Sequence, residues 1–241
     1  MGYKKGIQES TKSGRADLLK ITKNKEKKYQ ELLEATERKR LALEKEIFEI
    51  EEKIRITIDP ASLPSKGSGV LAHPLSDVSL ESCWKEGVTQ KNCITQYFGN
   101  TPFAISGAYR GKGHNGIDFR ADIGIPVFSA EKGVVEAMGD TDVGCQGASY
   151  GKWILIRHPN SLSTLYTHLS SVTISQGKEI NRGEQIAYSG SSGYATGPHL
   201  HFGVFATQAV RIESIKSRVC GRLMTLPIAA LNGYLNPLDY L

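Results

Sequence analysis

The sequence predicts a mainly β protein, in which an antiparallel β-sheet domain follows a long α-helical coiled-coil segment. Two observations support this fold class. Residues 17–58 contain neither glycine nor proline and are rich in lysine, glutamate, leucine and isoleucine, which favours one continuous helix. After residue 69, short runs of β-branched and aromatic residues alternate with glycine turns, which is typical of an antiparallel sheet. We therefore divide the chain into a coiled-coil helix (1–59), a linker (60–68) and a β-sheet domain (69–241).

The predicted helix carries an apolar seam along one side. From Leu19 on, the seam positions follow one another at alternating steps of three and four residues, which is the spacing of a coiled coil. The seam is most apolar in its C-terminal part, at Leu43, Ile47, Ile50 and Ile54. A single amphipathic helix of this length needs a partner to bury such a stripe. We expect that partner to be a second copy of the chain, another protein or a preceding helix.

The β-sheet domain contains six predicted strands, namely PVFSA, GVVEAMG, KWILIRH, STLYTHL, QIAYSG and HLHFGVF. One short helix is expected near LPIAALNGYL. The cluster DPASLPSKGSG, which precedes the domain, has the composition of a linker. With 241 residues, of which 39% are hydrophobic, the chain can bury a substantial core.

The net charge of +5 is unevenly distributed along the chain. Residues 1–28 hold nine Lys and Arg against three Asp and Glu, an excess that more often forms a solvated helix face than a binding surface. No nucleic-acid-binding motif accompanies it, so we expect no nucleic-acid partner. No run approaches 18 apolar residues, so no transmembrane segment is expected, and the first residues lack the apolar core of a secretory signal.

The cysteines predict disulfide bonds. They include no CxxC pair, so the common zinc and thioredoxin-like spacings are absent. Of the three pairings that four cysteines allow, we favour Cys83 with Cys93, which closes a short loop, and Cys145 with Cys220. Disulfides imply an oxidising, extracytoplasmic compartment, whereas four unpaired thiols would fit a cytosolic protein.

Four of the six histidines fall in three short segments of the β-sheet domain. His114 and Asp118 lie four residues apart in GHNGIDF, and His199 and His201 lie two apart in GPHLHFG. In an extended chain, residues an even number apart project from the same face. Two segments can therefore present imidazoles and a carboxylate around one cation, with His168 of YTHLS as a further imidazole. The other two histidines belong to no such pattern: His73 and His158.

Zinc fits these donors. Catalytic zinc sites commonly use three His, Asp or Glu ligands at about 2.0–2.2 Å and leave one position for water or substrate. The remaining imidazoles could act as acid or base, because the ordinary pKa of histidine is close to neutral pH. An isolated HxH is more often a hydrogen-bonded pair on a strand than a metal site. The agreement of three segments favours the metal.

Three motifs in this order, HNGIDF, LYTHLS and GYATGPHLHF, resemble those of the lysostaphin-like or LytM-type zinc metallopeptidases, which cut peptidoglycan peptides. The flanking segments QYFGNTPFA, SYGKWILIRH and NPLDYL look like one bacterial subgroup of that family. The resemblance covers roughly residues 69–241. It implies a zinc endopeptidase that acts on cross-links or stem peptides of peptidoglycan, in the bacterial cell envelope or after secretion.

The resemblance assigns a role to five residues. His114, Asp118 and His201 match the family's zinc ligands. His168 and His199 match its two catalytic histidines, which activate the water and stabilise the transition state. Which of these two is the base stays open.

Loops beside the site would shape the substrate groove. They contain Tyr109 and Tyr194, which are either groove residues or ordinary exposed tyrosines. The helix would hold the enzyme at a partner, such as a second copy or another envelope protein, or would fold back over the groove and restrain it.

Two alternative functions make different predictions. A non-catalytic LytM-like coiled-coil regulator, which activates a cell-wall amidase, would lack some metal ligands, yet all five positions are filled here. A zinc carboxypeptidase would use a different spacing between the first histidine and the aspartate. The HxxxD spacing favours the endopeptidase.

Overall fold

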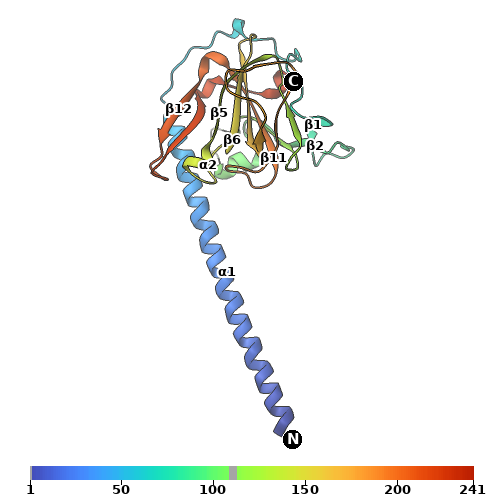
Figure 1. Cartoon of the computed structure of the whole chain (residues 1–241), viewed down its shortest axis with the longest axis vertical. Helices are drawn as coiled ribbons and strands as arrows, with labels where there is room; N and C mark the ends of the chain where they lie inside the picture. Colours follow the sequence, from blue (N-terminus) through green and yellow to red (C-terminus); the bar gives the residue numbers. More distant parts are fainter. Residues whose placement is uncertain (1, 109–112) are drawn as a thin grey trace. The chain divides into compact units, whose positions relative to one another are not determined.

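The computed structural model describes residues 2–108 and 113–241, with side chains from residue 18 on except at 107 and 108. Its internal contacts divide the chain into two compact units, residues 1–41 and residues 42–241, and each is considered by itself. The first unit is helical throughout its described part. The second unit contains all the strands (Figure 1).

The helix α1 (Gly2–Glu51) is longer at its N-terminal end than the sequence predicts, and it stops before residue 58. The residues that follow it include Ile54, Ile56, Thr57 and Ile58. Such β-branched residues lose side-chain freedom in a helix, which explains the earlier end. In the first unit, apolar residues such as Leu19 and Leu33 are exposed to solvent. A coiled-coil partner for them stays a prediction.

The last turns of α1, from residue 42 on, belong to the second unit. Leu43 and Ile47 are buried in a core cluster with Met224, Leu226 and Ile228. In the same turns, the Glu46 carboxylate accepts hydrogen bonds from the Ser217 hydroxyl at 3.0 Å and from the backbone N–H of Arg218 at 2.8 Å. The sheet unit therefore begins within the helix.

The main sheet has nine strands. Its order is β1-β2-β3-β11-β7-β6-β5-β9, and β14 pairs with β11. Their bounds are β1 (Val78–Ser82), β2 (Asn92–Gln96), β3 (Ile117–Arg120), β11 (His199–Ala206), β7 (Leu162–Leu169), β6 (Lys152–Arg157), β5 (Gly133–Asp140), β9 (Glu179–Ile180) and β14 (Tyr234–Leu235). Only β1 and β2 pair in parallel among these described strands. The predicted fold class, mainly β with a long N-terminal helix, is confirmed.

Two smaller sheets complete the unit. One contains β4 (Pro126–Phe128), β10 (Gln185–Tyr188) and β8 (Ser171–Val172), and the other pairs β12 (Val210–Lys216) with β13 (Leu223–Ala229). Each of the six predicted strand runs contains a strand of the structure. The short helix expected near LPIAALNGYL is wrong, because most of that segment forms β13, one 3-10 turn (Leu231–Gly233) and β14. Pro227 lies in β13, which is an edge strand, where a missing N–H is tolerated.

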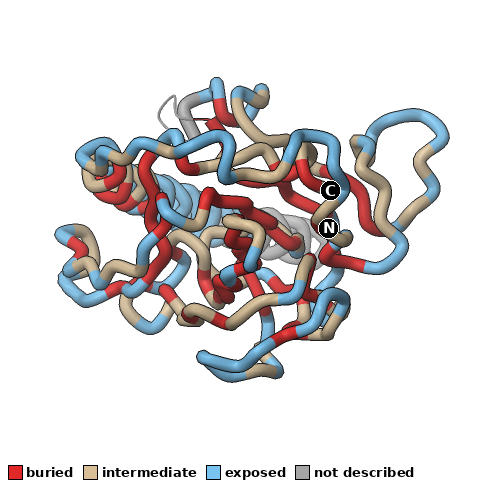
Figure 2. Tube along the Cα trace, turned by 90° about the horizontal axis from the view of Figure 1, so that it is seen from above, coloured by how far each residue is buried: buried red, intermediate tan, exposed pale blue. Residues whose placement is uncertain are grey.

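The core of the second unit lies between the main sheet and the small sheets and loops that cover it. Its largest fully buried side chains include Phe119, Ile154, Tyr166 and Phe202, which come from four neighbouring strands. The strands at the centre of the main sheet are mostly buried, and Figure 2 shows the buried segments in the interior and exposed segments around them. This packing fixes the strands that carry the site.

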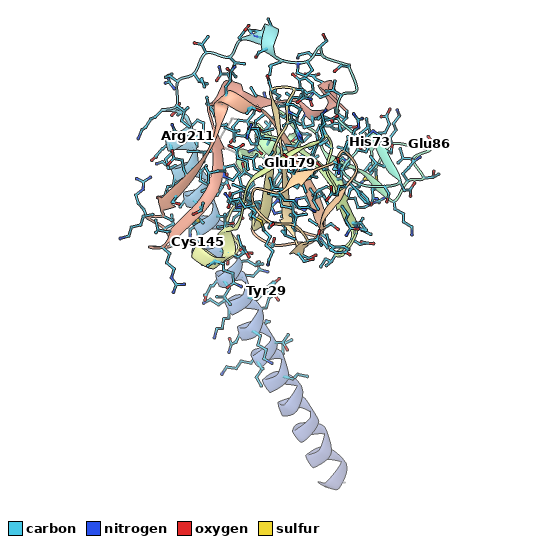
Figure 3. All side chains as sticks on the ribbon, turned by 45° about the horizontal axis from the view of Figure 1, so that its top comes forward. Tyr29, His73, Glu86, Cys145, Glu179 and Arg211 are labelled. Atoms are coloured by element: carbon cyan, nitrogen blue, oxygen red, sulfur yellow. A yellow bond between two sulfur atoms is a disulfide. The ribbon has the colours of Figure 1, made fainter. Side chains whose placement is uncertain are left out.

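Both favoured disulfide pairings are confirmed. Cys83 bonds to Cys93, and Cys145 bonds to Cys220. The first closes the loop between β1 and β2, and the second ties the loop after α2 (Thr141–Gly144) to the turn between β12 and β13. Cys145 is labelled in Figure 3. Among the residues that the structure describes, no helix is long and apolar enough to cross a membrane.

His158 supports the fold rather than the site, and it gives stability a pH dependence. Its Nδ1 lies 2.8 Å from the Lys132 carbonyl and its Nε2 lies 2.8 Å from Thr164 Oγ1. Burial lowers the pKa of His158 below its ordinary value of 6.5, against the opposing effect of the Lys132 carbonyl. As the pH falls below 6.5, His158 takes up a proton more readily in the unfolded chain than in the folded chain. The free energy of unfolding therefore falls with falling pH.

We expect the loss of stability between neutral and acidic pH to be smaller in His158→Asn than in the wild type. The measurement is the free energy of urea unfolding at about pH 7.5 and at about pH 5.5, compared with the wild type. His73→Asn, at an exposed histidine, is the control and should keep the wild-type difference. An unchanged difference in His158→Asn would contradict the prediction.

Candidate metal centre

The two strands β3 and β11 position the centre of the site. They pair antiparallel, with His201 directly opposite Asp118. Along β11, Leu200 and Phe202 are fully buried in the main core, so His199 and His201 project from the other face of the strand. The alternation predicted for HLHF is present.

His114 reaches the same place from the segment before β3. Its backbone forms an isolated antiparallel bridge with Gly99. Its ring Nδ1 lies 2.9 Å from the Tyr97 carbonyl, to which it donates a hydrogen bond. Because this bond occupies Nδ1, the ring is oriented with Nε2 toward Asp118 and His201.

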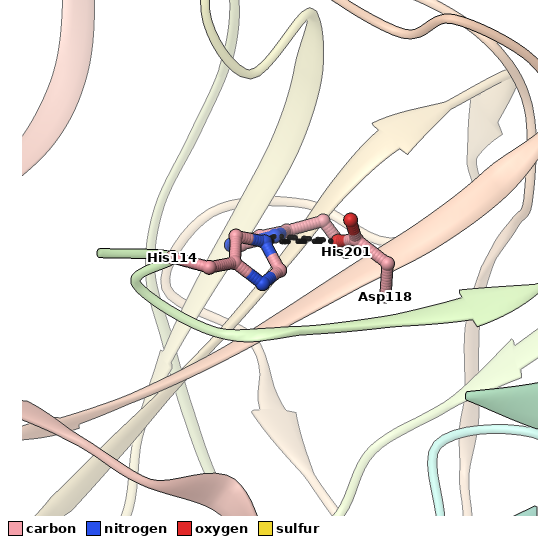
Figure 4. A group of neighbouring side chains, drawn as sticks. All are labelled: His114, Asp118 and His201. Carbon is pink, nitrogen blue, oxygen red and sulfur yellow. Dashed lines mark hydrogen bonds and ion pairs between the residues drawn. The ribbon is translucent and has the colours of Figure 1, made fainter. Parts of the chain in front are cut away.

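Three ligand atoms converge at this point (Figure 4). His114 Nε2 is 3.0 Å from His201 Nδ1 and 3.2 Å from Asp118 Oδ1, and His201 Nδ1 is 2.9 Å from the same oxygen. Donors at ordinary zinc distances around a tetrahedral ion lie about 3.3 Å apart. All three residues are buried. The spacing and the donor types therefore fit a metal ion.

The electrostatics of the cluster agree with this fit. Burial alone would raise the pKa of Asp118, but His114 and His201 hold it well below its ordinary value, so the carboxylate is charged.

The other nitrogen of the His201 ring, Nε2, points away from these contacts. It is buried and has no hydrogen-bond partner among the described residues. A Cβ at Gly116 would lie 2.8 Å from that nitrogen, so the glycine makes room for the ring. The ring is oriented by its Nδ1 contacts.

His168 and His199 stand beside the cluster. Their ring centroids are 4.5 Å apart, and that of His168 is 6.2 Å from that of His201. His168 donates from Nδ1 to the Ser192 carbonyl at 2.8 Å, and His199 donates from Nδ1 to the Gly197 carbonyl at 2.8 Å. With Nδ1 engaged in each ring, Nε2 is the nitrogen left to face a substrate or water.

His168 also has an unusual backbone conformation and protonation. Its φ is 59°, in the left-handed region that costs a non-glycine residue roughly 1–2 kcal/mol. The hydrogen bond from its N–H to the Tyr150 carbonyl, at 2.9 Å, helps hold it there. Burial, with the nearby His199 and His201, lowers the pKa of His168 well below its ordinary value. The ring is neutral at neutral pH.

One pocket brings together the five predicted site residues, His114, Asp118, His168, His199 and His201. Tyr194 lines it as well, whereas Tyr109 lies outside the described residues. A further wall of the pocket is formed by Glu44, Ile47 and Glu51 of α1. The sequence offered a helix folded over the groove as one of two alternatives, but it did not indicate which helix residues would line the pocket.

Two polar contacts involve residues that line this pocket. The Tyr234 hydroxyl donates to the Glu51 carboxylate, and Asn115 Nδ2 donates to the Tyr150 hydroxyl at 3.0 Å. Burial, together with the charge of Glu51, raises the pKa of Tyr150. Its phenol is therefore protonated and can donate a hydrogen bond. The Tyr150 ring centroid lies 6.2 Å from that of His201, at the edge of the His-Asp-His group.

A buried His-Asp-His cluster with two further imidazoles at its edge has the donor set of a metallohydrolase. Residues 112–212 match Peptidase family M23. This range includes all five predicted site residues.

Parts of the chain are similar to known proteins and to solved structures. The chain is 40% identical over 90 residues to the peptidoglycan DD-endopeptidase ShyA of Vibrio cholerae. The aligned residues make up 37% of this chain and 19% of that protein. It is 42% identical over 89 residues to the DD-carboxypeptidase/endopeptidase Mpg of Neisseria meningitidis, with coverages of 37% and 19%. Lysostaphin from Staphylococcus simulans is similar, with 28% identity and a TM-score of 0.41 over 48% of this chain and 43% of that one. The chain thus spans about a fifth of the length of the curated relatives named here.

Proposed function

We propose that this protein is a zinc metalloendopeptidase that hydrolyses peptide cross-links or stem peptides of peptidoglycan. The observation that carries the proposal is the convergence of His114 Nε2, Asp118 Oδ1 and His201 Nδ1 within 2.9–3.2 Å of one another, inside the segment that matches family M23. The relatives' names, peptidoglycan DD-endopeptidase and DD-carboxypeptidase/endopeptidase, supply the substrate class.

These three residues would hold the zinc ion. The ion would polarise the scissile carbonyl and lower the pKa of a water molecule. The charged Asp118 would offset part of the ion's charge in a buried place, and the hydrogen bond to the Tyr97 carbonyl would hold His114 in the orientation of a ligand. Their role is to fix the ion, not to move protons.

Proton transfer falls to His168 and His199. Each has its Nδ1 proton held by a backbone carbonyl, so each offers Nε2 toward the reacting groups. One neutral ring accepts the proton of the attacking water, and the protonated ring can then stabilise the developing oxyanion or protonate the leaving amine.

We also propose an extracytoplasmic location, in the bacterial envelope or after secretion. Two disulfides and a cell-wall substrate support it. The exposed apolar residues of α1 before residue 42 support a coiled-coil partner, either a second copy or another envelope protein. The regulator that activates an amidase is not favoured, because the chain has a histidine or an aspartate at each of the five positions to which the family resemblance assigns a role.

Digestion of purified peptidoglycan of known cross-link type tests the proposal. We expect the zinc-loaded full chain to release fragments whose masses correspond to cleavage within a cross-link or stem peptide, and a chelator to stop the release. Release of single terminal amino acids alone would identify a carboxypeptidase instead. Intact peptidoglycan after prolonged incubation with zinc-loaded protein would contradict the proposal.

A further inference from the structure

A second hollow opens beside the metal centre. This groove, which we call the Trp84 groove, has a volume of about 650 Å³, within the range of about 300–1,000 Å³ usual for ligand sites. Asp118, His199, Gln96 and Thr196 line both the groove and the pocket of the metal centre. The two hollows therefore adjoin each other at the place where the reaction would occur.

Trp84 gives the groove its most unusual feature. Its side chain is 76% exposed, although the other tryptophan of the chain, Trp153, is fully buried. The segment that carries Trp84 is held rigidly, since the preceding Cys83 is bonded to Cys93 and its N–H donates to the Ile94 carbonyl at 2.9 Å. This segment follows β1, at the edge of the main sheet, in the loop that also carries Glu86 in Figure 3. A large aromatic side chain on a rigid exposed segment offers binding area at little entropic cost.

The groove is aromatic and almost uncharged. Tyr97 and Phe103 line it together with Trp84, and Phe103 is 43% exposed. Among its described lining residues, Asp118 is the only acidic one and none is lysine or arginine. Because Asp118 and His199 lie at the catalytic end, the rest of the groove matches an uncharged and partly apolar ligand segment.

A peptide bound across the metal centre must continue on both sides of the scissile bond. On one side the pocket is walled by Glu44, Ile47 and Glu51 of α1. The Trp84 groove provides the open continuation on the other side. We propose that Trp84 is a substrate-contacting residue, and that its groove binds the uncharged residues of the peptidoglycan peptide on one side of the scissile bond. This inference rests on the proposed function, which it deepens.

Kinetics of the full chain test the role of Trp84. With a sugar-free cross-linked peptide dimer as substrate, Trp84→Ala is expected to raise KM by about tenfold to a hundredfold and to change kcat little, because the contact lies away from the reacting atoms. Trp84→Phe should recover part of the loss. Ile123→Ala, at an apolar residue that is 62% exposed outside the groove, is the matched control and should leave KM unchanged.

Fluorescence gives a readout that needs no turnover. Since Trp153 is buried, quenching by acrylamide reports mainly on Trp84. In full-length His168→Ala, saturating peptide dimer should protect the indole from the quencher. Failure of the wild type to hydrolyse the dimer would count against the proposed function, but the quenching result would still decide the inference.

The inference has two ways to fail. An unchanged KM in Trp84→Ala, with wild-type hydrolysis intact, would overturn it while leaving the proposed function standing. Protection by sugar-bearing muropeptides but not by the sugar-free dimer would assign the groove to the glycan and overturn the peptide assignment.

Discussion

Replacing His168 or His199, which lie beside the three proposed metal ligands, should reduce turnover without reducing metal binding. In His168→Ala and His199→Ala we expect zinc content to stay at the wild-type level and the rate of peptidoglycan hydrolysis to fall by about 10²–10⁴-fold. Neither ring supplies one of the three converging ligand atoms, yet both present Nε2 at the edge of the cluster. In His114→Ala and Asp118→Ala both zinc and activity should be lost.

Metal analysis and dye release from labelled cell walls measure the two properties on the same preparations. His73→Ala, at an exposed histidine outside the pocket, is the control and should match the wild type in both. Full activity in His168→Ala would refute its role in proton transfer. Full zinc content in Asp118→Ala would refute its role as a ligand.

Removing the end of the helix should have the second large effect. A chain that begins at Gly69 lacks Leu43 and Ile47, which are buried against β13. Loss of a buried leucine or isoleucine side chain typically costs about 2–5 kcal/mol. We therefore expect this shorter chain to be several kcal/mol less stable than one that begins at Ala42, where the sheet unit starts.

Urea unfolding of the two shorter chains and of the full chain provides the comparison. Leu43→Ala in the full chain should reproduce part of the loss, whereas Leu32→Ala, at an exposed position of the same helix, should change stability little. Equal stabilities of the chains that begin at Ala42 and Gly69 would show that the helix end is dispensable. That result would support a domain boundary near residue 69, which stays a proposal.

A further variant tests whether the helix restrains the enzyme. Glu44, Ile47 and Glu51 line the pocket of the metal centre, so the helix end limits access from that side. If the helix restrains activity, Arg218→Ala, which removes the ion pair with Glu49 at 2.8 Å, should raise the hydrolysis rate. An unchanged or lower rate would count against restraint.

Local patterns were sufficient to predict much of the site. The alternation of His199 and His201 with buried residues follows from the two-residue period of a strand, whatever that strand pairs with. The pairing of His201 with Asp118 depends on β3 and β11 being neighbours, which the three motifs implied only through the family resemblance. The cysteine pairs followed from loop length and position along the chain.

Long-range packing explains what the sequence did not predict. Residues 42–51 continue the heptad seam of α1, so the pattern could not distinguish a partner helix from the edge of β13, against which Leu43 and Ile47 pack. Likewise, Trp84 looks like an ordinary loop residue until the sheet brings its loop beside the metal centre. In LPIAALNGYL, pairing with β12 outweighed the local helix signal.

Titration of the metal-free full chain with zinc is the most direct test of the central claim, that His114, Asp118 and His201 hold one ion required for peptidoglycan hydrolysis. The account predicts that the hydrolysis rate rises with bound zinc and saturates at one equivalent per chain, as expected for a single three-ligand site. Hydrolysis at the full rate before any zinc is added would contradict it.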